Sequence, residues 1–228
     1  GSMKRPRLQR DYEHGRVFGG SIFRRWIEPR RRQAAPIALK GRPMTEDKAR
    51  SRALDGYLIA AVRTGDGKAA DLLVRRWQPR LVAHGWRLTG DADLAREAVQ
   101  DGWIEILRGI GRLRDEAAFP AWAYRIVTRR CARRIRGRQH DRALAAAVAA
   151  EPVAAWVEAE AGDPPALLRL KRAMAGLPAE QRATVALFHL EDMSVAETAI
   201  ALNVPAGTVK TRLMHARRKL RAALEGET

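Results

Sequence analysis

The sequence contains one cysteine, Cys131, and no long apolar run. A single cysteine excludes an intramolecular disulfide framework and is typical of a protein from a reducing cytoplasm. No apolar run approaches the roughly 18–20 residues that a membrane-spanning helix needs. The histidines are scattered and lack the spacing of metal ligands; they are His14, His84, His140, His189 and His215. We therefore expect no disulfide, no membrane insertion, no metal and no other cofactor.

The usual signals of catalysis are missing as well. A nuclease would need carboxylates and histidines clustered around a metal, and the sequence shows no such cluster. No glycine motif that cradles phosphate is present. Cys131 lies in an arginine-rich stretch without a nearby histidine to activate its thiol. We expect no catalytic residues, and the sequence therefore favours a binding protein over an enzyme.

Acidic residues are scarce relative to basic ones. The 228 residues include 43 Lys and Arg against 26 Asp and Glu, which gives a formal net charge of +17. Charge of this size is informative about partners rather than about fold. It indicates either nucleic acid or an anionic membrane surface as the partner.

The uneven distribution of charge predicts four segments. Residues 1–43 carry 12 basic and 3 acidic residues, which favours a basic, disordered extension. Its first three residues resemble a cloning scar, and an over-long gene model beginning upstream of Met44 is the alternative. Residues 44–138 and 166–228 are expected to form helical domains. Residues 139–165, with 5 acidic residues and 1 basic residue in an Ala/Pro-rich stretch, are expected to form a mobile linker that lets the domains separate.

The spacing of apolar residues predicts an all-α fold of two small domains. Alanine, leucine, arginine and glutamate dominate, and these residues favour helices. Apolar residues recur at intervals of three and four, as a buried helix face requires. Leu167, Leu170, Met174 and Leu177 show this spacing throughout, and Leu94 with Ala98 and Ile104 with Leu107 show it in pairs.

Residues 194–220 have the pattern of a helix-turn-helix. Ser194 and Glu197 form a capping box, so a helix is expected to begin there and to end near Leu202. Pro205 disfavours helical geometry at the preceding residue but suits the first turn of a second helix. On that helix the predicted core stripe is Val209, Leu213, Ala216 and Leu220, and the predicted free face carries Thr211, Met214, His215 and Arg218. A recognition helix presents such a face to the major groove, although a solvated amphipathic helix has the same pattern.

The stretch LPAEQRATVALFHLEDMSVAETAIALNVPAGTVKTRLMHARRKL, residues 177–220, resembles domain four of bacterial sigma factors, especially the extracytoplasmic-function group. The stretch DADLAREAVQDGWIEILRGIGRLRDEAAFPAWAYRIVTRRCARRIR, residues 91–136, is similar to domain two of the same group. The two matches occur in the family's order. The resemblance implies a cytoplasmic promoter-specificity subunit of RNA polymerase that recognises −35 and −10 elements and promotes DNA melting. The alternative is a sigma-like adaptor that titrates an anti-sigma factor.

The resemblance also implies which residues contact the −35 element. Lys210, Thr211 and His215 match positions that reach base edges. The full set of expected −35 contacts is Lys210, Thr211, Arg212, His215, Arg217 and Arg218. Relatives often have arginine at the position of His215, and imidazole cannot make the two-pronged contact of arginine with guanine.

Contacts with the −10 element are expected from a loop and from the helix that follows it. Seven arginines and no acidic residue lie in residues 125–138, so we expect duplex phosphate against them. The resemblance adds the preceding loop as a pocket for a flipped base. The expected −10 contacts are Arg114, Asp115, Glu116, Phe119, Arg125, Arg129, Arg133 and Arg136. Trp122 and Ile126 are expected in the core.

The expected protein partners are core RNA polymerase, through its β′ coiled coil and β flap, and an anti-sigma factor. In the family, an acidic helix of domain two binds the β′ coiled coil. The matching residues are Glu97, Gln100, Asp101 and Glu105. Three of them recur at intervals of four, so they share one helix face that can meet a basic surface.

Overall fold

The structure is a computed structural model that describes residues 46–144 and 165–225. Every described element is helical, which confirms the all-α prediction for this part of the chain. The helices are α3 (Glu46–Arg63), α4 (Gly67–Thr89), α5 (Ala92–Gly109), α6 (Phe119–Leu144), α7 (Pro165–Ala175), α8 (Ala179–His189), α9 (Val195–Leu202) and α10 (Ala206–Glu225). Two short 3-10 helices, η1 (Ile110–Arg112) and η2 (Glu116–Ala118), connect α5 to α6.

Helices α3 to α6 pack into one bundle around a core of large apolar side chains. Trp77 of α4 lies at its centre, with its ring edge-on to Phe119 and Tyr124 at centroid distances of 5.2 and 5.9 Å. Helices α5 and α6 approach closely at Gly102, where an added Cβ would lie 3.2 Å from Cγ2 of Val127. The glycine therefore fixes how near α6, with its arginines, lies to the acidic helix α5.

Helices α7 to α10 form a second bundle that contains the helix-turn-helix. Ser194 and Glu197 make the predicted capping box at the start of α9. Asn203 ends α9 with a left-handed backbone (φ 55°), a conformation that asparagine tolerates better than most residues. The predicted core stripe of α10 is confirmed, because Val209, Leu213, Ala216 and Leu220 are all buried.

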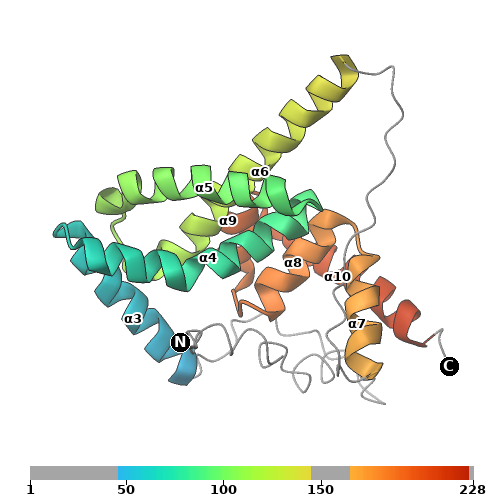
Figure 1. The fold of residues 1–228 in the computed structure, drawn as a ribbon. Helices are drawn as coiled ribbons and strands as arrows, with labels where there is room; N and C mark the ends of the chain where they lie inside the picture. The colour runs from blue at the N-terminus through green and yellow to red at the C-terminus, as the bar shows by residue number, and fades with distance from the viewer. Residues whose placement is uncertain (1–45, 145–164, 226–228) are drawn as a thin grey trace, which may run out of the picture.

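The two bundles are packed against each other, with α9 against α6 and α8 against α4 (Figure 1). Leu187, Met193 and Leu202 of the second bundle are buried in the same apolar cluster as Trp77 and Tyr124 of the first. The sequence predicted domains free to separate, and helix periodicity carries no information about contact between two bundles. The domain boundaries stay predictions, and the expected mobility of the linker concerns residues outside those that the structure describes.

The apolar residues of α5 do not all lie on its buried face. Ile104 and Leu107, whose spacing indicated a helix, have side chains that are 48% and 39% exposed. The buried stripe of α5 consists of Ala95, Ala98, Val99, Gly102, Trp103 and Ile106. This set has the better helical spacing, but it relies on small residues, which make the stripe difficult to see in the sequence.

Candidate nucleic-acid interface

The free face of α10 presents polar and basic side chains at the start of the helix. Lys210 and Thr211 are exposed, and Thr211 donates a hydrogen bond from Oγ1 to the backbone oxygen of Gly207 at 3.1 Å. Arg218 is exposed and His215 is half-buried. Met214, which was not among the expected contacts, is 60% exposed on this face. An exposed apolar side chain here can contact the methyl group of thymine.

Two of the expected arginine contacts on α10 are partly buried by interactions with other parts of the protein. The Arg212 guanidinium pairs with Glu180 at the start of α8, and its side chain is only 18% exposed. Arg217 is half-buried and interacts with other groups of the protein. Lys210, Thr211 and Arg218 are consequently the most accessible of the six expected residues.

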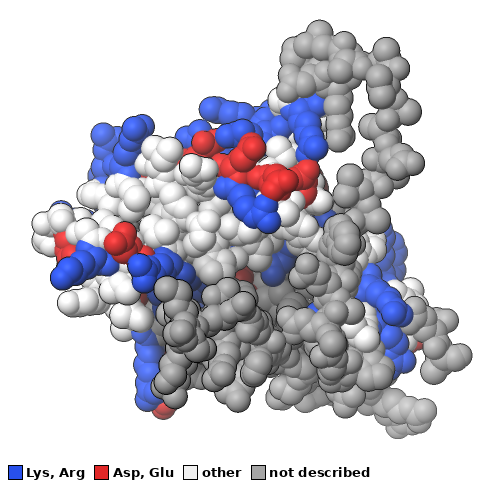
Figure 2. All heavy atoms as spheres, viewed as in Figure 1, with Lys and Arg blue, Asp and Glu red and all other residues white. Residues whose placement is uncertain are grey.

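The arginines of α6 have acidic partners on α5, which the sequence interpretation did not anticipate. Both Arg129 and Arg130 pair with Glu105, and Nη2 of Arg130 lies 2.8 Å from Oε2 of that carboxylate. Arg134 bridges Glu97 and Asp101 at 2.6 and 2.7 Å. Arg138 pairs with Asp91. Figure 2 shows acidic and basic side chains next to each other along this edge of the molecule.

The ion pairs shift the pKa values of their members. Burial alone would raise the pKa of Glu105, but hydrogen bonds and charge from Arg130 and Arg129 outweigh it and lower that pKa. The hydrogen bond from Arg138 is the main cause of the lowered pKa of Asp91. The hydrogen bond to Asp101 is the main cause of the raised pKa of Arg134. Carboxylates of α5 and of its N-cap therefore neutralise part of the arginine run within the protein, and duplex phosphate against the remaining arginines stays a prediction.

Three arginines of α6 remain available for phosphate. Arg125, Arg133 and Arg136 are exposed, and none has an acidic partner within residues 46–144 and 165–225. They recur at intervals of eight and three, which places them on one side of the helix. Arg129 lies on the same side and keeps 53% of its side-chain surface exposed despite its pairing with Glu105.

The loop before α6 carries the remaining expected contacts with the −10 element. Arg114 and Asp115 are exposed, and the Asp115 carboxylate accepts a hydrogen bond from the backbone N–H of Ala117 at 2.9 Å. Glu116 pairs with Arg63 of α3. Phe119 is completely buried, because it begins α6 and packs on Trp77. The expected contact of Phe119 with DNA is therefore wrong. Its buried side chain instead anchors the end of the loop to the core through Trp77.

The expected core role of the two neighbouring side chains on α6 agrees with the structure. Ile126 is 3% exposed. Trp122 is partly buried against the main apolar cluster, and its ring lies 6.2 Å from that of Phe119.

The outer face of α5 combines polar and apolar groups. Glu97 and Gln100 are exposed, whereas Asp101 and Glu105 are partly buried beside the arginines of α6. The exposed side chains of Ile104 and Leu107 join them on this face. Protein interfaces usually have an apolar centre and a polar rim, and this face has both.

The described residues hold neither a candidate metal site nor a candidate membrane span. They contain no group of three or more His, Cys, Asp or Glu side chains that could hold a metal ion. No helix among them is long and apolar enough to cross a bilayer. Cys131 is buried, and burial raises the pKa of its thiol to about 12, so the thiol is unreactive in this structure.

These features define a class of protein: an all-helical, two-bundle, basic protein with a helix-turn-helix and an arginine-lined helix. Family models agree, since sigma-70 region 2 matches residues 73–140 and sigma-70 region 4 matches residues 167–220. The chain is 38% identical over 173 residues to the ECF RNA polymerase sigma factor SigM of Mycobacterium tuberculosis, covering 73% of this chain and 82% of that protein. It is 29% identical over 181 residues to the RNA polymerase sigma-H factor of Pseudomonas aeruginosa, covering 75% and 94%.

The chain therefore belongs to the ECF RNA polymerase sigma factors, as its sequence motifs predicted. Solved structures share its fold. One is the sigma factor RpoE in complex with the anti-sigma factor NepR from Bartonella quintana, with a TM-score of 0.57, 24% identity and coverage of 68% of this chain and 96% of that one. Another is CnrH in complex with the cytosolic domain of CnrY, with a TM-score of 0.53, 22% identity and coverage of 77% and 99%.

Proposed function

We propose that this chain is a promoter-specificity subunit of bacterial RNA polymerase that acts in the cytoplasm. One observation carries the proposal: a single chain with both sigma-70 regions presents an accessible recognition helix, α10, and an arginine-lined helix, α6. In this role the chain binds core polymerase, recognises the −35 and −10 elements and promotes DNA melting. The role requires no catalytic group of its own.

Sequence reading at the −35 element is assigned to α10. Lys210, Thr211 and His215 face base edges, with Met214 placed to contact a thymine methyl group. Arg218 is accessible to the phosphate backbone, as are the parts of Arg212 and Arg217 that remain exposed. Phosphate contacts position the helix, and base contacts provide the specificity.

Binding at the −10 element is assigned to α6 and to the loop before it. Arg125, Arg133 and Arg136 have accessible guanidiniums without an acidic partner in the described part of the chain, which suits them to phosphate. Arg129 shares this face but must first give up part of its interaction with Glu105. Arg114, Asp115 and Glu116 lie in the loop, where they are placed to contact an unpaired base.

Binding of core polymerase is assigned to the outer face of α5. Glu97, Gln100, Asp101 and Glu105 provide polar groups, and the exposed side chains of Ile104 and Leu107 provide apolar surface toward the end of the helix. The proposed partner surface is the basic face of the β′ coiled coil, with the β flap contacting the second domain. An anti-sigma factor is a further proposed partner, in keeping with the NepR complex of the structurally similar RpoE.

Reconstitution with purified core polymerase tests the proposal. Core enzyme plus this chain is expected to start transcripts from a restricted set of sites on genomic DNA. Core enzyme alone is the negative control. Failure to initiate anywhere, while an unrelated sigma factor works in the same assay, would contradict the proposal. Retained binding to an anti-sigma factor in that case would favour the adaptor instead.

A charge reversal identifies the polymerase-binding face. Glu97→Lys is expected to weaken binding to core polymerase by roughly tenfold, because it places a cation where an acidic face meets a basic surface. Asp71→Lys is the matched control: Asp71 is an exposed acidic residue on α4, and its replacement changes the net charge equally. Equal affinities of the two variants would remove Glu97 from the interface.

A further inference from the structure

One arginine of α3 contacts both of the 3-10 helices that connect α5 to α6. Arg63 is the last residue of α3, and its Nε donates a hydrogen bond to the backbone oxygen of Ile110, the first residue of η1, at 3.4 Å. Its Nη1 donates to Oε1 of Glu116, the first residue of η2. Glu116 also lies over Gly56 of α3, where an added Cβ would be 3.8 Å from the Cβ of Glu116. A single guanidinium therefore joins both short helices to α3.

The α5–α6 loop (residues 110–118) has little regular structure of its own. Each of its 3-10 helices is three residues long, and the hydrogen bonds of such helices have poor geometry. The backbone N–H of Leu113 closes η1 with a hydrogen bond to Ile110 at 3.2 Å, and the Asp115 side chain caps η2. The shape of the loop therefore depends on contacts that attach it to the helices around it.

Apolar side chains attach the loop to the core on either side of its exposed part. Leu113 packs against the main apolar cluster, and Phe119, directly after the loop, is fully buried. Residues 114–118 lie between these two attachments and carry the proposed DNA contacts. Arg63 reaches this exposed stretch through its ion pair with Glu116. The ion pair therefore acts on the part of the loop that the apolar contacts leave free.

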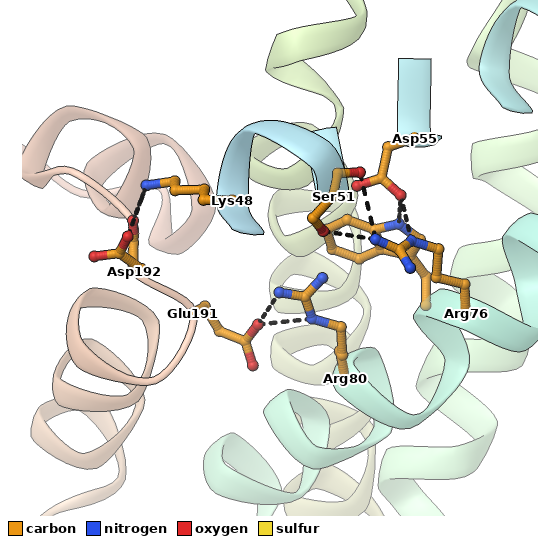
Figure 3. Close-up of polar contacts among 8 residues, drawn as sticks. Lys48, Ser51, Asp55, Arg76, Arg80, Glu191 and Asp192 are labelled. Atoms are coloured by element: carbon orange, nitrogen blue, oxygen red, sulfur yellow. Dashed lines mark hydrogen bonds and ion pairs between the residues drawn. The ribbon is translucent and has the colours of Figure 1, made fainter. Parts of the chain in front are cut away.

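Arg63 extends from a helix that is firmly attached to the core of its bundle. Nε of Arg76 on α4 donates to Oδ1 of the buried Asp55 on α3 at 2.7 Å, and Nη2 of Arg76 donates to Oγ of Ser51 at 2.6 Å (Figure 3). Nε1 of Trp77 donates to the same oxygen of Asp55 at 3.0 Å. Because α3 is fixed on α4 in this way, a contact from α3 holds the loop at a defined place.

The ion pair between Arg63 and Glu116 remains charged at neutral pH. A hydrogen bond from its own backbone N–H is the main cause of the lowered pKa of Glu116, and the positive charge of Arg63 lowers that pKa further. The two side chains keep 26% and 37% of their surface exposed. Exposed ion pairs contribute little to global stability. Loss of this pair should therefore affect the mobility of the loop more than the stability of the bundle.

A loop that already has its binding shape binds a ligand more tightly than a mobile loop, because binding does not have to order it. Capture of an unpaired base must already offset the cost of unstacking that base. The apparent dissociation constant equals the intrinsic one divided by the fraction of molecules in the receptive shape. Loss of one exposed ion pair and one hydrogen bond from a charged group changes that equilibrium by roughly tenfold.

We propose that Arg63 is a positioning residue that holds the α5–α6 loop in the shape that receives an unpaired base of the −10 element. Arg63 acts through Ile110 and Glu116 and does not itself contact DNA. The role of the loop in base capture rests on the proposed function. The attachment of the loop to α3 does not.

The test compares variants of the full chain. Arg63→Ala removes both contacts with the loop. Arg75→Ala is the matched control, because it removes the same charge from an exposed position on α4. Arg63→Lys keeps a cation that can pair with Glu116 and should recover part of every effect of Arg63→Ala. Circular dichroism and thermal unfolding establish that all three variants are folded.

Loop mobility is measured in the free chain by hydrogen exchange. Arg63→Ala is expected to speed exchange of the backbone amides of Leu113 and Ala118, which donate hydrogen bonds within the loop, by roughly tenfold. Arg75→Ala should leave these amides unchanged. Equal exchange in the two variants would overturn the positioning role, and no recovery with Arg63→Lys would exclude the pair with Glu116 as its basis.

Base capture is measured with core polymerase bound to each variant. The probe is a single-stranded oligonucleotide that the unsubstituted chain, with core polymerase, selects from a pool randomised over the −10 element. Arg63→Ala is expected to bind this probe roughly three- to tenfold more weakly than Arg75→Ala does. Its slope of log affinity against log salt concentration should equal that of the unsubstituted chain. A slope lower by about 0.7 would mean that Arg63 itself binds phosphate, which would overturn the proposal.

The two measurements separate the proposal from the function on which it rests. Faster loop exchange in Arg63→Ala with unchanged affinity for the probe would overturn the link between Arg63 and base capture. If loop exchange is faster but the unsubstituted chain with core polymerase selects no sequence from the pool, the attachment of the loop stands and the proposed function fails.

Discussion

Acidification should destabilise this protein through one buried histidine, His84. Its side chain is fully buried, with Nε2 2.9 Å from Oγ1 of Thr128 on α6. Its ring lies edge-on to Tyr124 at a centroid distance of 5.0 Å, and Nδ1 has no hydrogen-bond partner among the residues that the structure describes. Burial, assisted by the positive charge of Arg87, lowers the pKa of His84 from 6.5 to about 3. The ring is therefore neutral in the folded protein.

The size of the effect follows from the difference between the two pKa values. Below pH 6.5 the unfolded chain binds a proton at His84 that the folded chain does not, so stability falls as the pH falls. Between pH 8 and pH 5 this linkage removes about 2 kcal/mol from the free energy of unfolding. The loss continues down to about pH 3, where the folded protein is also protonated at His84.

The assay is urea unfolding of the unsubstituted chain and of His84→Gln at pH 8 and pH 5. Glutamine can keep a hydrogen bond to Thr128 but does not titrate, so it is expected to show a pH dependence smaller by about 2 kcal/mol. The carboxylates contribute equally to both proteins and cancel in the comparison. Identical pH dependences would refute the assignment of His84 as a neutral, buried group.

Four further predictions, which use five substitutions, test other parts of the structure. Arg133→Ala should lower the slope of log affinity for promoter DNA against log salt concentration by about one. Arg134→Ala should lower that slope less, because two carboxylates of α5 already neutralise Arg134. Equal slopes for the two variants would contradict this division. Ser194→Ala removes the N-cap of α9 and should lower the free energy of unfolding in urea by about 1 kcal/mol. An unchanged urea midpoint would show that the cap does not stabilise the fold. Ile104→Asp should weaken polymerase binding at least tenfold, with little change in Tm because the side chain is 48% exposed; unchanged binding would exclude it from that interface. Leu187→Ala should lower the free energy of unfolding by about 2–5 kcal/mol. Calorimetry should show one unfolding transition, because side chains of both bundles share the apolar cluster of Leu187. Two transitions would contradict that shared core.

The sequence predicted well those features that depend on neighbours along the chain. The capping box of Ser194 and Glu197 and the buried stripe of α10 follow from hydrogen-bond reach and helical period. The family assignment followed from motifs of the same local kind. Local pattern was therefore sufficient for the fold class and for the orientation of the recognition helix.

Features that depend on contacts between distant elements were not predicted. The carboxylates that neutralise Arg134 lie 33 and 37 residues earlier in the chain, and only the close approach of α5 and α6 brings them together. Phe119 was placed on the DNA surface because it lies in the matching loop, but its contact with Trp77 buries it. The packing of the two bundles also depends on pairs such as Arg80 and Glu191, 111 residues apart, which no helical period reveals.

The assignment of sequence reading to α10 can be tested directly by transcription from a promoter library randomised across the −35 element. Core polymerase is combined with the unsubstituted chain, with His215→Arg or with Arg133→Ala, and the transcribed promoters are sequenced. His215→Arg adds a two-pronged donor and should increase the preference for guanine at one position of the −35 element. Arg133→Ala should reduce transcription from all promoters without changing the base profile. An unchanged profile with His215→Arg, together with an altered −35 profile with Arg133→Ala, would contradict the account.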